Sequence, residues 1–153
     1  AVSNGTQTEA VFNRLAADAA AVDVLCYCLP AWEYEPDAPN FTPRISGCIT
    51  RNAALSIIKR ASDGSALRYY FEVPLIPGTG KMIATYTGDN ENPLPSFTGE
   101  PQDVGIPWSN PAEAAQAVYE ALGPVPGGPD FRVAAAAVFA GADIAMQVKN
   151  RHS

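Results

Sequence analysis

Near its start the chain has the apolar periodicity of a helix. From Thr8 to Leu29 apolar side chains recur every three or four positions, which predicts a helix that is either continuous or broken near Ala21. Thr8 with Glu9 can cap its start. A second helix is predicted over 109–122, where a proline stands in the first turn.

Between and after these helices the chain is rich in β-branched and aromatic residues, which is typical of β-strands. The predicted strands are Arg44–Thr50, Ala53–Arg60, Leu67–Val73, Lys81–Tyr86, Phe131–Ala140 and Asp143–Val148. Short turns at Asp63–Ser65 and Pro77–Gly80 predict that the first four strands form an antiparallel meander. The stretch 87–107 is predicted to be irregular.

The order of helix, strands, helix and strands predicts an α+β fold in which helices cover antiparallel sheets. Strands 53–60 and 67–73 carry apolar residues on both faces, as strands of an inner layer do. With 153 residues, of which 47% are hydrophobic, the chain can bury one core, so we expect a single domain over 1–153.

Charge and cysteine content narrow the class of protein. Ten Lys and Arg against 16 Asp and Glu give a net charge of −6, which makes nucleic acids and anionic membranes poor partners. No apolar run of the sequence reaches the length of a membrane span. The three cysteines, at 26, 28 and 48, are expected to be reduced thiols of a cytoplasmic protein. His152 is the single histidine, so a zinc site would lack ligands of the usual spacing.

The turn Ser3–Thr8, in the sequence SNGTQTE, is the first of three stretches with candidate chemistry. It presents several hydroxyl and amide groups at once, and Gly5 is suited to the positive φ of a tight turn. A simpler interpretation is that the turn only caps the helix that follows.

The second stretch, WEYEPDAPNFTPRI, places Glu33, Glu35 and Asp37 shortly before Arg44. Like charges close together raise the pKa of a carboxyl group, which general acid–base catalysis uses, and an arginine fork binds phosphate or carboxylate. A solvated acidic loop with an ordinary ion pair explains the same spacing. The third stretch, 86–101, is either a functional loop or a surface excursion held by prolines.

Four motifs in this order, VSNGTQTE, YEPDAPNFTPRI, RYYFEV and TYTGDNENPLPSFTGEP, resemble the IMP cyclohydrolases of the archaeal type and their bacterial relatives. The resemblance covers nearly all of the chain. It implies a four-layer αββα sandwich of the N-terminal-nucleophile-hydrolase type, used without a processed nucleophile, which fits Ala1. The family's N-terminal strands precede the Ser-Asn-Gly-Thr turn and are absent from this chain, so we expect it to represent the later part of the family pattern.

The resemblance also implies an activity: formamidoimidazole carboxamide ribotide closes its purine ring and loses water to give inosine monophosphate, with no metal or organic cofactor. Glu35 is then the expected acid–base carboxylate, with Tyr34 and Arg44 as the other catalytic residues, and Arg44 either contacts substrate or holds Glu35. Glu33 and Asp37 are secondary candidates for the acid–base role. The residues expected to bind substrate are Ser3, Asn4, Gly5, Thr6 and Thr42, with Asn4 and Thr6 on the ring substituents.

Two other functions stay open. One is a non-catalytic purine-nucleotide-binding relative, and the other is a hydrolase of small amides with the same fold, against which Ala1 argues because it has no nucleophilic side chain. The expected partner is a purine ribonucleotide, with neither nucleic acid nor membrane. We expect the chain to form a homo-oligomer or to be completed by a second chain that carries the N-terminal strands.

Overall fold

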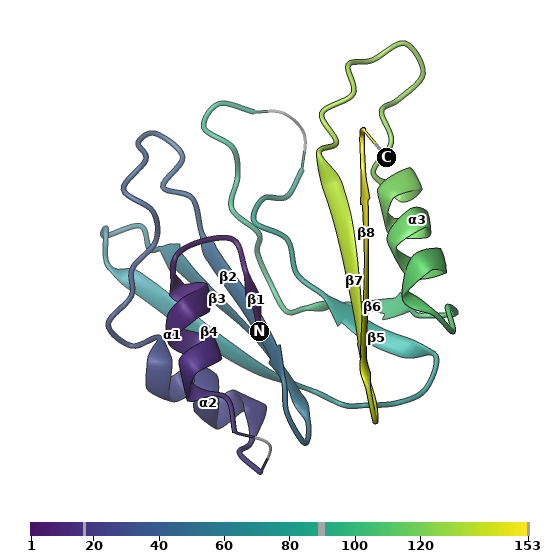
Figure 1. The fold of residues 1–153 in the computed structure, drawn as a ribbon. Helices are drawn as coiled ribbons and strands as arrows, with labels where there is room; N and C mark the ends of the chain where they lie inside the picture. The colour runs from purple at the N-terminus through teal and green to yellow at the C-terminus, as the bar shows by residue number, and fades with distance from the viewer. Residues whose placement is uncertain (17, 89–90, 153) are drawn as a thin grey trace. The chain divides into compact units, whose positions relative to one another are not determined.

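The computed structural model describes residues 1–16, 18–88 and 91–152. Within them the chain is a mixed α and β protein with three helices and antiparallel sheets (Figure 1). It divides into two compact units, Ala1–Gly105 and Ile106–Ser153, each of which is described by itself. In the described part of the chain, no helix combines the length and apolar character that a membrane span requires.

The first unit is built on a four-stranded antiparallel sheet with the order β1-β2-β3-β4. A separate two-stranded sheet pairs β5 with β6. The elements of this unit are β1 (Val2–Ser3), α1 (Gln7–Arg14), α2 (Ala21–Cys28), β2 (Arg44–Ile49), β3 (Ala53–Arg60), β4 (Ala66–Val73), β5 (Thr79–Met82) and β6 (Gln102–Gly105).

One face of the four-stranded sheet packs under the helices, and there the core forms. Cys48 and Ala54 face each other across β2 and β3, and Ile58 lies further along the same face. These side chains are buried against apolar side chains of α1 and α2 because strand residues two apart share a face. The residues that the helices and their ends contribute are Val11, Ala21, Val24, Leu25 and Leu29.

The opposite face of this sheet is apolar as well, as the sequence predicts for an inner-layer strand. Ile57 pairs with Tyr69, and Leu55 pairs with Phe71, across β3 and β4. The Tyr69 and Phe71 rings stack with their centroids 6.4 Å apart. Ile57 is buried, but Tyr69 is 40% exposed, so within the described structure this face is only partly covered.

The second unit consists of α3 (Pro111–Ala121) packed on the hairpin of β7 (Ala134–Ala140) and β8 (Ile144–Asn150). Asn110 caps the helix, because its side-chain oxygen accepts a hydrogen bond from the backbone N–H of Glu113. Pro111 occupies the first helical position, as predicted.

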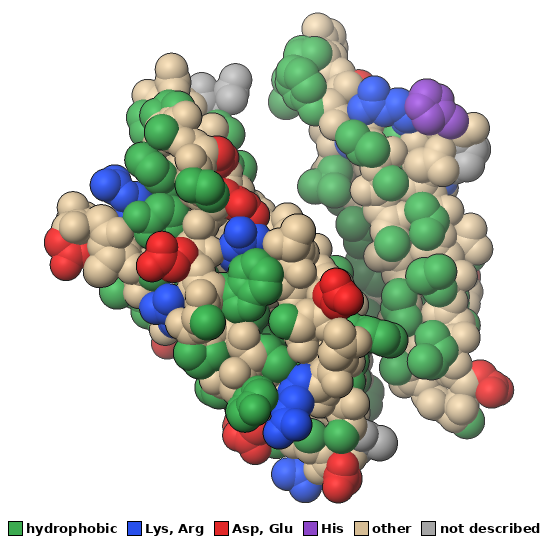
Figure 2. Space-filling model, turned by 60° about the vertical axis from the view of Figure 1, so that its left-hand side comes forward, with side chains coloured by type: hydrophobic (Ala, Val, Ile, Leu, Met, Phe, Trp, Pro, Cys, Tyr) green, Lys and Arg blue, Asp and Glu red, His purple; other side chains and the backbone are tan. Residues whose placement is uncertain are grey.

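The hairpin of the second unit has one covered and one open face. Ala135 is buried, while Val138 and Met146, which pair with each other, are more than half exposed on the other face. Ile144, at the end of the same row, is 77% exposed. Figure 2 shows hydrophobic side chains gathered on the visible face of the unit that ends near the purple His152. Helix α3 therefore covers only one side of a hairpin that is apolar on both.

Several predicted elements differ from the observed ones. The N-terminal helical stretch follows the second of its two predicted forms: it is broken into α1 and α2, with α2 beginning at Ala21, and Ala17 in the interruption lies outside the described residues. Helix α1 begins at Gln7, so Thr8 is not its cap; the hydroxyl of Thr8 instead donates to the carbonyl of Gly5 at 2.8 Å. The helix therefore begins two residues earlier than a cap at Thr8 would place it.

The predicted fourth strand of the meander is also wrong. Its pairing segment is Thr79–Met82 rather than Lys81–Tyr86, and its partner is β6, which lies in the stretch predicted to be irregular. The meander therefore contains β2, β3 and β4 only. Polar sequence and short length explain why Gln102–Gly105 gave no strand signal.

Candidate functional site

The turn that opens the chain is fastened to the start of β2. The side-chain amide of Asn4 donates to the carbonyl of Pro43 at 2.8 Å, and its oxygen accepts from the backbone N–H of Ile45 at 2.9 Å. The same amide group also donates to the hydroxyl of Thr85 at 3.3 Å. Asn4 thus uses its hydrogen-bonding capacity to hold three segments of chain together.

Glu35 and Arg44 form an ion pair beside this turn. Arg44 Nη1 lies 2.5 Å from Glu35 Oε1, and the two side chains are 11% and 33% exposed. Arg44 Nε donates to the carbonyl of Glu33 at 2.7 Å, and the guanidinium carbon lies 5.1 Å from the centroid of the Trp32 ring. Among the described residues, none accepts a hydrogen bond from Nη2 of Arg44.

Gln7 joins the ion pair to the turn, and the sequence analysis did not select it. Its side-chain oxygen accepts from Arg44 Nη1 at 3.0 Å, and its side-chain nitrogen lies 3.4 Å from the side-chain oxygen of Asn4. Gln7 is fully buried, as is Val11 one turn later. The sequence offered one signal that Gln7 is buried: it stands four positions before the apolar Val11 and therefore on the same face of the helix.

The structure explains the glycine at position 5 differently from the prediction of a positive φ. Gly5 does not adopt a positive φ. Instead, a Cβ atom at this position would lie 2.6 Å from Arg44 Nη1, 2.6 Å from Gln7 Oε1 and 3.1 Å from Glu35 Oε1. A Cβ at this position would displace the ends of the Arg44 and Gln7 side chains, because the turn backbone lies against the ion pair.

The loop between Glu35 and Thr42 is closed at its ends by a hydrogen bond from the backbone N–H of Glu35 to the carbonyl of Thr42, at 2.9 Å. Inside it, Asp37 accepts from the backbone N–H of Thr42 at 2.7 Å and from the Thr42 hydroxyl. These two hydrogen bonds lower the pKa of the Asp37 carboxyl below its ordinary value. Asp37 therefore stabilises the conformation of the loop through these hydrogen bonds.

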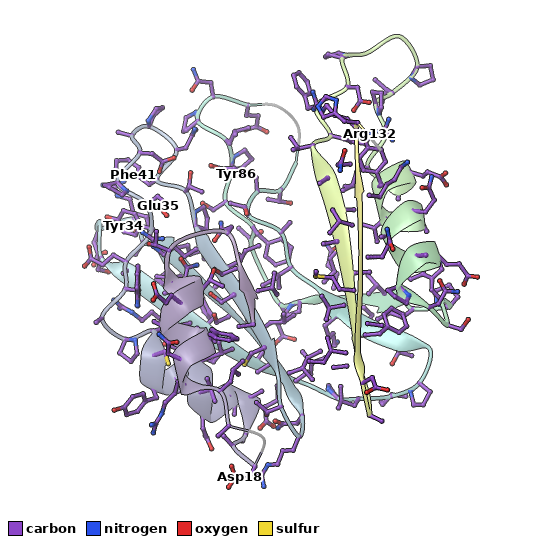
Figure 3. All side chains as sticks on the ribbon, viewed as in Figure 1. Asp18, Tyr34, Glu35, Phe41, Tyr86 and Arg132 are labelled. Carbon is purple, nitrogen blue, oxygen red and sulfur yellow. The ribbon has the colours of Figure 1, made fainter. Side chains whose placement is uncertain are left out.

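Tyr86, which lies on another segment of the chain, also contacts this loop. Its hydroxyl lies 2.5 Å from the hydroxyl of Thr42, which bonds with Asp37 in turn. Figure 3 labels Glu35 on the connection before β2 and Tyr86 on the segment after β5. The contacts of Asn4 with Thr85 and of Thr42 with Tyr86 bring together three of the stretches selected from the sequence; Asp89 and Asn90, in the third of these, lie outside the described residues.

Tyr34 does not join the ion pair of its neighbour Glu35 but contacts other residues. Its hydroxyl donates to the carbonyl of Gly64 at 2.8 Å, and its ring meets that of Phe41 edge to face with centroids 5.8 Å apart (Figure 3). Phe41 has a φ of +46°, a left-handed conformation that is uncommon for a non-glycine residue. The Tyr34–Phe41 contact supports that strained residue within the loop.

The remaining predicted binding residues lie in the turn. The hydroxyl of Ser3 donates to the hydroxyl of Thr8, which in turn donates to the carbonyl of Gly5. Thr6 is exposed, and its side chain makes no cap hydrogen bond to α1. Of the two hydroxyls at 3 and 6, that of Thr6 is the one not engaged by the turn.

A cavity of about 380 Å³ in the second unit does not compete with this site. Arg132 is its cationic residue, but Nε and Nη2 of Arg132 bond with the carboxylate of Asp130, and Nη1 bonds with the carbonyl of Tyr119. With its guanidinium occupied in this way, the cavity offers little to an anionic ligand. In the described residues, no group of three or more His, Cys, Asp or Glu side chains is arranged to hold a metal ion.

Comparison with known proteins agrees with the motifs at this site. The sequence profile of the family described as "IMP cyclohydrolase-like protein" matches residues 1–140. A relative named IMP cyclohydrolase, from Methanothrix thermoacetophila, is 30% identical over 122 residues. That match covers 76% of this chain and 58% of the relative, so the chain spans less than two thirds of the relative's length. No solved structure matches the chain. The extent of the family match shows that the chain belongs to the IMP cyclohydrolase-like protein family.

Proposed function

We propose that this chain carries IMP cyclohydrolase activity and closes the purine ring of formamidoimidazole carboxamide ribotide to give inosine monophosphate and water. The observation that carries the proposal is the Glu35–Arg44 ion pair, placed where the N-terminal turn, the 35–42 loop and the segment at Tyr86 meet. Family membership and the relative named IMP cyclohydrolase support the same activity.

The reaction asks little of the protein beyond positioning and proton transfer. Both reacting groups, the carboxamide nitrogen and the formyl carbon, already belong to one molecule. The nitrogen attacks the formyl carbon, a C–N bond forms, and the formyl oxygen becomes a hydroxyl. That hydroxyl then leaves as water together with a proton from the former formamide nitrogen.

Glu35 is the residue proposed to move protons. It is a carboxylate in its ion pair with Arg44, so it begins the cycle as a proton acceptor and takes a proton from the attacking nitrogen. It gives that proton to the formyl oxygen, which becomes the hydroxyl. In the second step it passes the proton of the former formamide nitrogen to the departing hydroxyl, which leaves as water. One-third exposure of the side chain leaves room for contact with a ligand. Glu33 contributes its backbone carbonyl and Asp37 braces its loop, so Glu35 is the preferred carboxylate.

Arg44 is proposed to bind the substrate through Nη2 while Nη1 holds Glu35 in place. Thr6, with a hydroxyl not used as a cap, is proposed to bind a ring substituent. Ser3, Asn4 and Gly5 act by setting the shape of the turn, and Thr42 acts by fixing the loop. Tyr34 is proposed to contribute by orienting Glu35, its neighbour in the chain.

We also propose the finer architecture and the setting that the family suggests, a four-layer αββα sandwich in a cytoplasmic enzyme. Each of the two helix-covered sheets has an apolar second face, as the inner layers of such a sandwich require. Side chains such as Ile144 and Met146, exposed on the hairpin of the second unit, support association with another copy or a second chain.

The test is direct. Purified protein is incubated with formamidoimidazole carboxamide ribotide, and inosine monophosphate is quantified by chromatography, with the mass of the protein in solution measured on the same sample. We expect ring closure above the uncatalysed rate. Tight binding of inosine monophosphate without turnover would instead identify a non-catalytic nucleotide-binding protein, and release of ammonia from small amides would identify an amide hydrolase.

A further inference from the structure

Gln7, at the start of α1, is a fully buried amide. Buried polar side chains are retained where their hydrogen bonds are satisfied, since an unsatisfied amide in a core is costly. Every contact of this amide leads toward the site and none leads toward solvent: its partners are Arg44, Asn4, Ile45 and Ser46.

The orientation of the Gln7 amide follows from those partners. Arg44 Nη1 can only donate, so the oxygen must face it, at 3.0 Å. The carbonyl of Ile45 can only accept, so the nitrogen must face it, at 3.4 Å. Reversing the amide would set two donors against each other and two acceptors against each other. The amide is therefore locked, and its oxygen is a fixed acceptor for the guanidinium.

We propose that Gln7 is a positioning residue for ring closure, which acts through Arg44. Its oxygen and that of Glu35 share Nη1, and the carbonyl of Glu33 takes Nε. With acceptors at both Nη1 and Nε, the rotation of the planar guanidinium is fixed. That rotation decides where Nη2 points and where the carboxylate of Glu35 is held. The inference rests on the proposed function.

The expected effect is large because water is poorly placed to substitute for Gln7. The side chain of Arg44 is 11% exposed, and Gln7 is buried completely. Loss of one hydrogen bond to a charged group in such a place corresponds to about 10–100-fold in the population of the correct geometry. We therefore expect Gln7→Met, which keeps length and apolar packing, to lower turnover by about 10–100-fold.

A double-mutant cycle tests the inference. Gln7→Met, Arg44→Lys and the double variant are compared with the wild type for ring closure and for unfolding in denaturant. If Gln7 acts through Arg44, Gln7→Met costs at most about twofold in turnover once Arg44 is lysine. Gln7→Asn, which retains an amide but draws it back by one methylene, gives the same pattern and serves if the methionine variant does not fold.

Two controls separate positioning from general destabilisation. Asn52→Ala removes the 2.7 Å hydrogen bond to the backbone N–H of Ala21 and so weakens the same unit without touching Arg44. Gln116→Met makes the same substitution at an exposed position of α3. Both controls are expected to keep wild-type turnover at a temperature where all the variants are folded.

Additive effects of Gln7→Met and Arg44→Lys on turnover would overturn the inference while leaving the proposed function intact. So would wild-type turnover in a folded Gln7→Asn variant. A wild-type protein that neither closes the ring nor binds inosine monophosphate would overturn the proposed function itself and with it the catalytic meaning of Gln7, although coupling in the unfolding experiment would still report the contact.

Discussion

The hydroxyl of Tyr86 lies 2.5 Å from the hydroxyl of Thr42, although the two residues are 44 positions apart in the chain. Because Thr42 also donates to Asp37, its hydroxyl must accept the proton of Tyr86. The three side chains thus form a directed chain of hydrogen bonds that ends on a carboxylate. It ties the 35–42 loop, which carries Glu35, to the segment after β5.

Tyr86→Phe is expected to destabilise the protein, because it removes the hydrogen bond to Thr42 and leaves the half-buried aromatic ring in place. Loss of one hydrogen bond costs about 1 kcal/mol, which lowers the thermal midpoint by about 2–4 °C in a chain of this size. Thr42→Val should cost more, since it also removes the hydroxyl hydrogen bond to Asp37, while Thr42→Ser keeps both hydroxyl bonds. Differential scanning calorimetry gives the order, and an unchanged midpoint in Tyr86→Phe would show that the hydroxyl pair contributes nothing.

Gly5→Ala is expected to lower ring closure by about 10–100-fold, because misplacement of a catalytic pair by a fraction of an ångström to an ångström has effects of this size. The added Cβ would meet Arg44 Nη1 and Gln7 Oε1 at 2.6 Å each. Gly105→Ala is the matched control, since a Cβ there meets no atom within 4 Å. Equal activity of the two alanine variants would mean that the turn can withdraw from the ion pair.

Glu35→Gln should slow ring closure by about 10²–10⁴-fold, the usual contribution of one general acid–base group. Affinity for inosine monophosphate, measured by calorimetry, should change much less. Glu33→Gln is the natural comparison because only the backbone carbonyl of Glu33 contacts Arg44. Full turnover of the Glu35 variant at saturating substrate would remove this residue from the mechanism, and loss of turnover only in the Glu33 variant would move the role there.

Arg44→Lys keeps the charge but loses the fork that bonds with Glu33, Glu35 and Gln7 together. We expect affinity for inosine monophosphate to fall by about 10–100-fold, as charge-assisted hydrogen bonds are lost. Arg51→Lys, at an exposed arginine of the same unit, should bind like the wild type. Wild-type affinity in the Arg44 variant would make this residue an ordinary structural ion-pair partner.

Acid should weaken the second unit through Asp130. Its hydrogen bonds with Arg132 lower the pKa of the Asp130 carboxyl from 3.8 to about 2. A carboxyl whose pKa is lowered in the folded state contributes stability above its unfolded pKa, and that contribution is lost as the pH falls through the folded value. Unfolding should therefore become easier from about pH 4 to about pH 2, and Asp130→Asn should flatten this dependence. Asp143→Asn should leave the pH dependence of unfolding unchanged. Identical dependences in the wild type and both variants would show that Asp130 does not cause the loss of stability in acid.

Local pattern predicted much of the fold. Helix α3 was readable because its cap Asn110, its Pro111 and its periodic alanines agree with one another. The strands β2, β3 and β4 were readable because each is long and tight turns separate them. Strand β6 was not, because its four residues pair with β5 across about twenty intervening positions, a contact that no local pattern reports.

The site was partly predictable for the same reason. Glu35 and Arg44 belong to one short motif, and the structure places them in direct contact. Gln7 and Tyr86 reach the site from outside that motif, one as a buried amide and the other through a hydroxyl 44 residues away from its partner. A glutamine in a first helical turn is usually solvated, and the one local sign against this is that Gln7 shares a helix face with the buried Val11.

The strict pairing of β7 with β8 has a consequence for how this part of the chain can change over evolution. Val138 faces Met146 on the open side, while Ala137 and Gln147 share the other side. Exchange among aliphatic residues at 138 or 146 preserves this division, but a shift of one strand by a single residue would turn Gln147 to the open side and Met146 under the helix. The hairpin can therefore drift in composition while its register stays fixed.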